Sequence, residues 1–169
     1  MKSKKIISFV TAASMILSML PGIVFAADET ADGVYSCDFT KLVNDGQDTQ
    51  YGKAEDIIAI DEYTTAYLTY EGTYVDANGT VYLSGTGKAK DSYKNSSYIE
   101  FTAPENGTVN FTIDYADYFI DETYTGYSSA STELTKGQKL RIAERASNRS
   151  KVMSISFTPS QAAENTPAP

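Results

Sequence analysis

Residues 108–115 alternate strictly between apolar and polar side chains, and this pattern constrains the fold more than any other feature of the chain. Val109, Phe111, Ile113 and Tyr115 fall on one face, and the residues between them are Thr, Asn, Thr and Asp. A period of two is typical of a β-strand with one face in a core and the other in water. We therefore predict a half-buried strand here, with Tyr115 in the core.

Similar short apolar segments recur along the chain and are separated by turn residues. Further strands are predicted at 34–40, 66–70, 98–102, 139–143 and 152–158, whereas 54–60 fits either one helical turn or a buried strand. Asn78-Gly79 and Asn106-Gly107 each predict a hairpin turn. Helical periodicity is almost absent. We predict an all-β fold, a two-sheet antiparallel β-sandwich of jelly-roll-like type over residues 34–158, with a closed barrel as the alternative.

Both ends of the chain differ from this region. Residues 1–26 combine three lysines, an apolar stretch and a Val-Phe-Ala sequence, which predicts a signal peptide cleaved after Ala26. The apolar stretch is short for a membrane-spanning helix of about 20 residues. Residues 27–33 are polar and predict a flexible leader. Residues 159–169 contain three prolines and no large apolar residue, which predicts a disordered linker or tail and suggests a downstream domain. We expect a secreted, extracellular protein.

Charge and composition exclude several functions. The chain has 14 basic and 22 acidic residues. Removing the signal peptide takes away three lysines, which leaves 11 basic against 22 acidic residues and a net charge of about −11. Such a charge opposes binding to nucleic acid and to anionic membranes. Histidine is absent, which excludes His-dependent catalytic triads and His-ligated metals. Cys37 is the single cysteine, so no intramolecular disulfide can form, and its alternation with Tyr35 and Phe39 predicts a small buried side chain.

The chain contains thirteen tyrosines, which are candidates for ligand contacts. Aromatic rings offer an apolar face to sugar C–H groups, and the phenol hydroxyl can bond to sugar hydroxyls. Tyrosine is also a favoured strand residue, so many of these rings are expected to pack within the fold. Tyr35 and Tyr115 are predicted to be structural. The candidates for ligand contact lie in loop-like stretches: Tyr63, Tyr93, Tyr118, Tyr124 and Tyr127.

Basic residues are concentrated in 136–151, where six lysines and arginines face a single acidic residue, Glu144. Guanidinium groups bind carboxylates in bidentate fashion. We therefore predict that Arg141, Arg145 and Arg149 contact a uronate-containing polysaccharide. The alternative is that these cations neutralise acidic neighbours within the protein.

Three aspartates follow the strongest strand pattern, at Asp114, Asp117 and Asp121. Carboxylate oxygens suit Ca²⁺, so these residues are the predicted ligands of a structural calcium ion. Their spacing does not match the EF-hand motif, and solvated surface charge is the alternative. An acidic chain also offers carboxylate pairs by chance, so we predict no catalytic residues and no enzyme activity.

Four segments carry a resemblance to a known group of modules. They are YSCDFTKL at 35–42, YIEFTAPENGTVNF at 98–111, LTKGQKL at 134–140 and VMSISFT at 152–158. Together they resemble accessory β-sandwich modules, of carbohydrate-binding type, in secreted clostridial-type polysaccharide-degrading proteins such as pectate lyases and esterases. The resemblance implies a non-catalytic carbohydrate-binding or accessory module. The alternative is a structural or adhesive domain that mediates protein contacts or spacing and binds no sugar.

Overall fold

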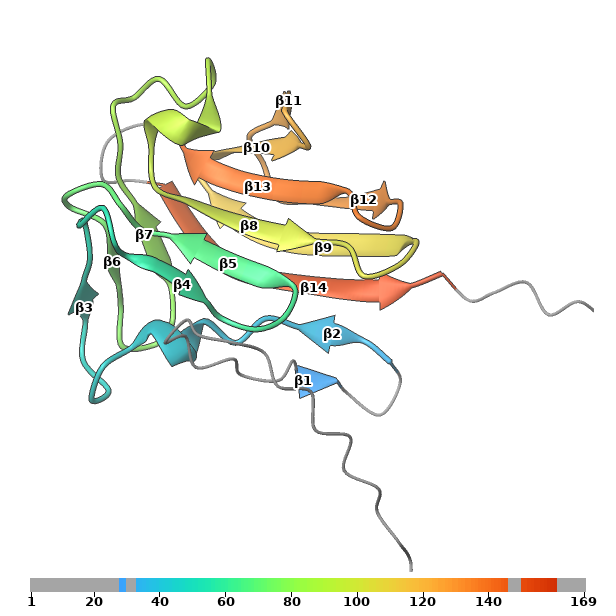
Figure 1. The fold of residues 1–169 in the computed structure, drawn as a ribbon, viewed down its shortest axis with the longest axis horizontal. Coiled ribbons are helices and arrows are strands. Elements are labelled where there is room, and N and C mark those ends of the chain that lie inside the picture. The colour runs from blue at the N-terminus through green and yellow to red at the C-terminus, as the bar shows by residue number, and fades with distance from the viewer. Residues whose placement is uncertain (1–27, 30–32, 146–149, 161–169) are drawn as a thin grey trace, which may run out of the picture.

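The computed structural model describes residues 28–29, 33–145 and 150–160, so the predicted signal peptide and most of the predicted C-terminal linker lie outside it. The described chain forms two antiparallel sheets that pack against each other, which confirms the all-β sandwich (Figure 1). Two short 3-10 helices, η1 (Phe39–Leu42) and η2 (Tyr93–Asn95), join the strands. Within these residues no helix is both long and apolar enough to span a membrane.

The first sheet is built around the C-terminal strand, β14. One edge of β14 pairs with β9, which in turn pairs with β12; the other edge pairs with β7 and with β2. The remaining strands extend the sheet in the order β7-β6-β3 and β2-β1. Its strands are β1 (Asp28–Glu29), β2 (Tyr35–Ser36), β3 (Thr49–Gln50), β6 (Tyr74–Val75), β7 (Val81–Leu83), β9 (Gly107–Asp114), β12 (Ala130–Leu134) and β14 (Ser150–Pro159).

The second sheet has the order β11-β10-β13-β8-β5-β4. Its strands are β4 (Ile57–Ala59), β5 (Thr64–Tyr67), β8 (Tyr98–Thr102), β10 (Ala116–Ile120), β11 (Thr123–Gly126) and β13 (Lys139–Glu144). Figure 1 shows this sheet lying over β9 and β14 of the first. The ambiguous segment 54–60 thus supplies a strand, β4, rather than a helical turn, but it lies at the edge of the sheet with Ile57 exposed, so the prediction that this strand is buried is wrong.

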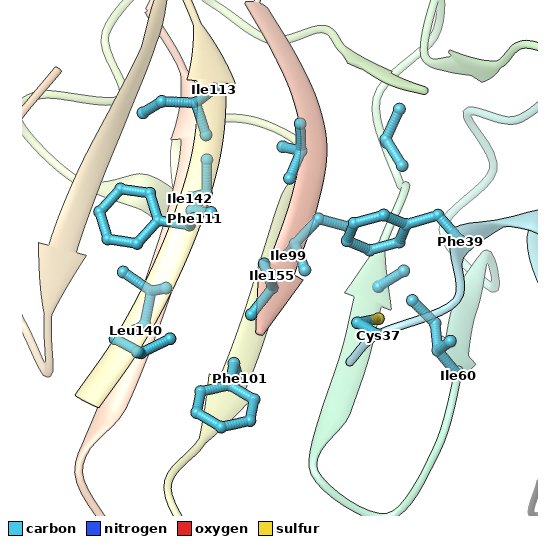
Figure 2. Close-up of a cluster of buried hydrophobic side chains, with 14 of the residues drawn as sticks. Cys37, Phe39, Ile60, Ile99, Phe101, Phe111, Ile113, Leu140, Ile142 and Ile155 are labelled. Carbon is cyan, nitrogen blue, oxygen red and sulfur yellow. The ribbon is translucent and has the colours of Figure 1, made fainter. Parts of the chain in front are cut away.

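The core lies between the two sheets, as alternation predicts. Val109, Phe111 and Ile113 of β9 point into it, and Leu140 and Ile142 of β13 do so from the opposite layer (Figure 2). Burial of such side chains is the main stabilising contribution in a sandwich of this size. The predicted burial of two residues near the N-terminal end of the sandwich, Tyr35 and Cys37, is also confirmed.

The turn predictions had different outcomes. Asn78-Gly79 lies in the hairpin between β6 and β7, as predicted. The hairpin predicted at Asn106-Gly107 is wrong, because β8 and β9 belong to different sheets and the intervening loop crosses from one to the other. A tight turn at Asn-Gly therefore indicates a reversal of the chain but not which strands pair. Asp28–Glu29, within the segment predicted to be a flexible leader, pairs with β2.

Candidate functional site

Three segments that are distant in sequence meet at one end of the sandwich. They are the end of β9, the connection between β11 and β12, and the residue that follows β13. Together they line a cavity of about 420 Å³, a volume within the range of roughly 300–1,000 Å³ typical of small-ligand sites. Its lining residues are Ile113, Asp114, Tyr115, Tyr127, Ser128, Ser129 and Arg145.

The alternating pattern predicts the wrong environment for one residue of this site, Tyr115. β9 ends at Asp114 and β10 begins at Ala116, so one residue carries the chain from the first sheet to the second. Tyr115 adopts a left-handed backbone conformation with φ of 52°, and its side chain is 49% exposed. The prediction that Tyr115 lies in the core is therefore wrong, because the chain leaves the strand one residue earlier and turns the ring outward.

Arg145 connects the two exposed tyrosines of the cavity. Its guanidinium carbon lies 3.8 Å from the centre of the Tyr127 ring and 5.6 Å from the centre of the Tyr115 ring. Tyr127 is 57% exposed. Cation–π contacts of this kind hold a guanidinium against an aromatic face while leaving N–H groups for other partners. The predicted binding residues Tyr127 and Arg145 are thus brought together, and Tyr115 joins them.

Two serines, the buried Ser150 and the exposed Ser129, bond to the backbone of the residues that line the cavity. Arg145 donates its backbone N–H to Ser150 Oγ at 2.8 Å, and Ser150 Oγ donates to the Tyr115 carbonyl at 2.6 Å. On the opposite wall Ser129 Oγ accepts from the Ile113 N–H at 2.9 Å and donates to the Ile113 carbonyl at 3.0 Å. These bonds tie loop residues to the ends of strands.

The charge of Arg145 is balanced by a carboxylate beneath the cavity. Arg145 Nη1 donates to Asp117 Oδ1 at 3.4 Å, and Asp117 is buried. Burial raises the pKa of Asp117, although Arg145 and Lys90 act in the opposite direction. The cavity therefore presents a guanidinium that covers one face of Tyr127, the exposed parts of the two tyrosine rings, serine hydroxyls and the Asp114 carboxylate. This combination suits a polyhydroxylated ring that carries an acidic group.

The other predicted cation, Arg141, lies in an internal network on the outer face of the second sheet. Arg141 Nε and Lys139 Nζ each donate to the Glu100 carboxylate at 2.7 Å, and the Arg141 guanidinium stacks 4.5 Å from the Tyr93 ring. Burial works against the ionised form of Glu100, but these two bonds lower its pKa overall. Arg141 is itself buried. It follows the alternative interpretation, in which these cations neutralise acidic neighbours.

The remaining aromatic candidates pack within the protein. The Tyr118 ring meets Phe111 edge-on at 4.8 Å, and the Tyr124 ring meets Phe119 edge-on at 5.7 Å. Lys90 also covers Tyr124, at 5.1 Å from the ring centre. Neither tyrosine lines the cavity. Arg149 lies outside the described residues.

The three aspartates predicted to bind calcium are not brought together. Asp114 pairs with Lys151 at 3.2 Å, Asp117 pairs with Arg145, and Asp121 accepts the Lys139 backbone N–H at 3.0 Å. Asp117 and Asp121 are separated by most of strand β10, about 13 Å at the rise of an extended chain. Across residues 28–29, 33–145 and 150–160, no group of three or more His, Cys, Asp or Glu side chains could hold a metal ion.

Comparisons with known proteins add little to this geometry. No family model matches the chain, and no curated protein matches it. One solved chain that does match comes from work described as "The complexity of the Ruminococcus flavefaciens cellulosome reflects an expansion in glycan recognition"; it is 18% identical, with 77% of this chain and 97% of that chain covered, at a TM-score of 0.38. A likeness of that degree decides neither the fold nor the function of this chain.

Proposed function

We propose that this protein is a secreted, non-catalytic carbohydrate-binding module whose ligand occupies the cavity between Tyr115, Tyr127 and Arg145. The observation that carries the proposal is the pairing of two half-exposed tyrosine rings with one guanidinium in one cavity. Sugars combine apolar C–H faces with hydroxyl groups, and these surfaces match aromatic rings and polar side chains respectively. The resemblance of the sequence to accessory sandwich modules points the same way.

We further propose an acidic polysaccharide, such as one containing uronate, as the ligand. Arg145 supplies a planar group with several N–H donors. Among the described residues it forms one ion pair, with Asp117. A second carboxylate from the ligand would complete the coordination of the guanidinium. We propose a module rather than an enzyme; the lining contains one carboxylate, Asp114, whereas glycoside hydrolysis in most families uses two.

A structural or adhesive domain remains the second candidate, and specific contacts favour it. Arg141 and Lys139 are engaged by Glu100, and two tyrosine pairs stack on each other: Tyr67 with Tyr98, and Tyr74 with Tyr82. Cations and rings used in this way stabilise the sandwich whether or not a sugar is present. Under this alternative the cavity would have no glycan ligand.

Affinity gel electrophoresis against polygalacturonate, pectin, xylan, β-glucan and cellulose tests the proposal. We expect retardation by polygalacturonate. Tyr127→Ala and Arg145→Ala should each weaken it about three- to tenfold, since an aromatic contact contributes on the order of 1 kcal/mol. The matched controls are Tyr70→Ala, a partly buried tyrosine away from the cavity, and Lys136→Ala, an exposed cation away from it.

The outcomes separate the two candidates. Retardation by neutral polymers that depends on Tyr127 but not on Arg145 would keep carbohydrate binding and discard the acidic ligand. Migration unchanged by every polymer would favour the structural or adhesive domain. Equal effects of the cavity variants and their controls would place the ligand elsewhere on the surface.

A further inference from the structure

A row of side chains crosses the outer face of the first sheet and begins at the cavity. Lys151 of β14 is the Cα partner of Asp114 in β9 and of Tyr82 in β7. Tyr82 is in turn the partner of Tyr74 in β6, and Tyr74 of Gln50 in β3. The neighbours of these residues along their strands point into the core: Val75, Val81, Ile113 and Val152. The row therefore faces outward.

Contacts along the row are continuous. Lys151 Nζ lies 3.2 Å from Asp114 Oδ2 and 5.7 Å from the centre of the Tyr82 ring. The Tyr82 and Tyr74 rings stack with centres 4.3 Å apart and planes 7° apart. Rings packed face to face direct their edges and hydroxyls, rather than their faces, toward solvent. The Asp114 and Lys151 side chains are 58% and 35% exposed, so the row remains accessible to a ligand.

Asp114 belongs both to the cavity lining and to the row, which makes the two surfaces continuous. From β9 to β6 the row covers three strand spacings, about 14 Å. Over that length it presents the paired carboxylate and ammonium groups of Asp114 and Lys151, and then the two phenol hydroxyls, which bond to each other. Groups that donate and accept hydrogen bonds along one line match the hydroxyl groups of successive sugars in one chain.

We infer that the row Asp114–Lys151–Tyr82–Tyr74 extends the cavity, and that the ligand is an extended stretch of one polysaccharide chain rather than a single sugar or a chain end. This inference rests on the proposed function, because the cavity anchors the chain that the row then follows. The cavity supplies ring and carboxylate contacts, and the row supplies hydrogen bonds to further residues of the same chain. Affinity should therefore rise with the length of the oligosaccharide.

Isothermal titration calorimetry of the full protein with oligogalacturonides and with xylo-oligosaccharides, each from the disaccharide to the octasaccharide, tests this inference. The double variant Tyr74→Phe/Tyr82→Phe removes both hydroxyls and keeps the stacked rings. It should leave binding of the shortest bound oligosaccharide unchanged and weaken binding of the longest about three- to tenfold, the effect of losing one or two neutral hydrogen bonds. The matched control is Tyr67→Phe/Tyr98→Phe, whose rings stack on the opposite sheet with centres 4.4 Å apart.

The results distinguish the cavity, which belongs to the proposed function, from the row, which belongs to this inference. Affinity that rises with length in the wild type and loses this rise in the Tyr74/Tyr82 variant supports the inference. Binding that depends on Tyr127 but not on length, or a Tyr74/Tyr82 variant that behaves as its control, overturns the row and leaves the cavity as the site. A wild-type protein that binds neither series nor any of the polymers overturns the proposed function and the inference with it.

Discussion

Arg141 and Arg145 lie in the same basic stretch of sequence, and their surroundings give them different roles. Arg141 is within β13, where a cross-strand carboxylate, Glu100, and the Tyr93 ring enclose it. Arg145 follows the end of the strand and lies against the exposed Tyr127 ring. The strand predicted at 139–143 already separates the two positions, but the sequence does not reveal that Glu100 lies across from Arg141 in the sheet, so it predicts both arginines as ligand contacts. At the residue scale, the cross-strand partner separates the structural cation from the candidate binding cation.

Glu144 is the residue whose burial should affect stability most directly. It is fully buried; Gly87 donates its backbone N–H to Oε2 at 3.1 Å, and Oε1 has no partner among the described residues. Burial raises the pKa of this carboxyl, so the native state favours its protonated form. A carboxyl of this kind contributes stability below its unfolded pKa, near pH ~4, and loses that contribution as pH rises through its folded pKa.

We therefore expect Glu144→Gln to become more stable relative to the wild type as pH increases. At about pH 4 both proteins carry a neutral side chain and the difference in unfolding free energy should be smallest. As pH rises to ~7 the wild type must either bury a charge or keep a proton that the unfolded chain releases, and the variant does neither, which should move the difference by on the order of 1 kcal/mol in favour of the variant. Urea unfolding at several pH values measures this. A difference that stays constant with pH would show that Glu144 titrates alike in both states.

At the scale of elements, the sequence predicts individual strands better than their neighbours. Alternation identifies β9, β13 and β14. In β9 and β14 one face is buried and the other is largely in water, whereas in β13 the polar residues on the outer face are buried as well. It does not reveal that β8 and β9 lie in different sheets, since pairing depends on contacts distant in sequence. The cavity has the same origin: it forms where the ends of β9 and β13 meet the β11–β12 connection. A period-two pattern assumes that the strand continues, so it predicts the wrong side for single residues at such junctions, and Tyr115 is the clearest case.

Ser150, the first residue of β14, links two of these junctions, and its removal should affect both binding and stability. Ser150→Ala leaves the Arg145 N–H and the Tyr115 carbonyl without this partner, at a cost of about 1–3 kcal/mol in unfolding free energy. Affinity for polygalacturonate should fall as well, because Arg145 and Tyr115 lose the side chain that connects their backbones. The control is Ser97→Ala, since Ser97 is also buried and accepts the Tyr70 N–H away from the cavity. That variant should lose stability and keep its affinity. Equal affinity losses in both variants would indicate general loosening of the fold.

For the whole molecule, three buried or partly buried carboxyls and the net charge determine how stability varies with pH. Burial raises the pKa values of Asp117 and Glu144, so their contributions decline as pH rises above about 4. Glu100 is the opposite case: its bonds to Lys139 and Arg141 hold its pKa below the usual value despite burial, so its contribution is lost as pH falls below about 4. The chain also carries a formal net charge of −8 at pH 7, and the resulting self-repulsion decreases as carboxylates protonate.

These effects together predict maximum stability in mildly acidic solution. Thermal unfolding followed by circular dichroism should give a higher Tm at about pH 5 than at pH ~7, because two buried carboxyls and the net charge all favour the lower value. Below pH ~4 the Tm should fall, as Glu100 becomes protonated and loses its ion pairs with Lys139 and Arg141.

Glu144→Gln should reduce the gain in Tm between pH ~7 and about 5. Glu100→Gln should instead lower the Tm at both of these pH values, because it removes the nearer of the two carboxylates that pair with the buried Arg141 guanidinium and leaves the exposed Glu122 at 3.6 Å. A Tm that is highest at neutral pH would mean that the ion pairs outweigh the two buried carboxyls.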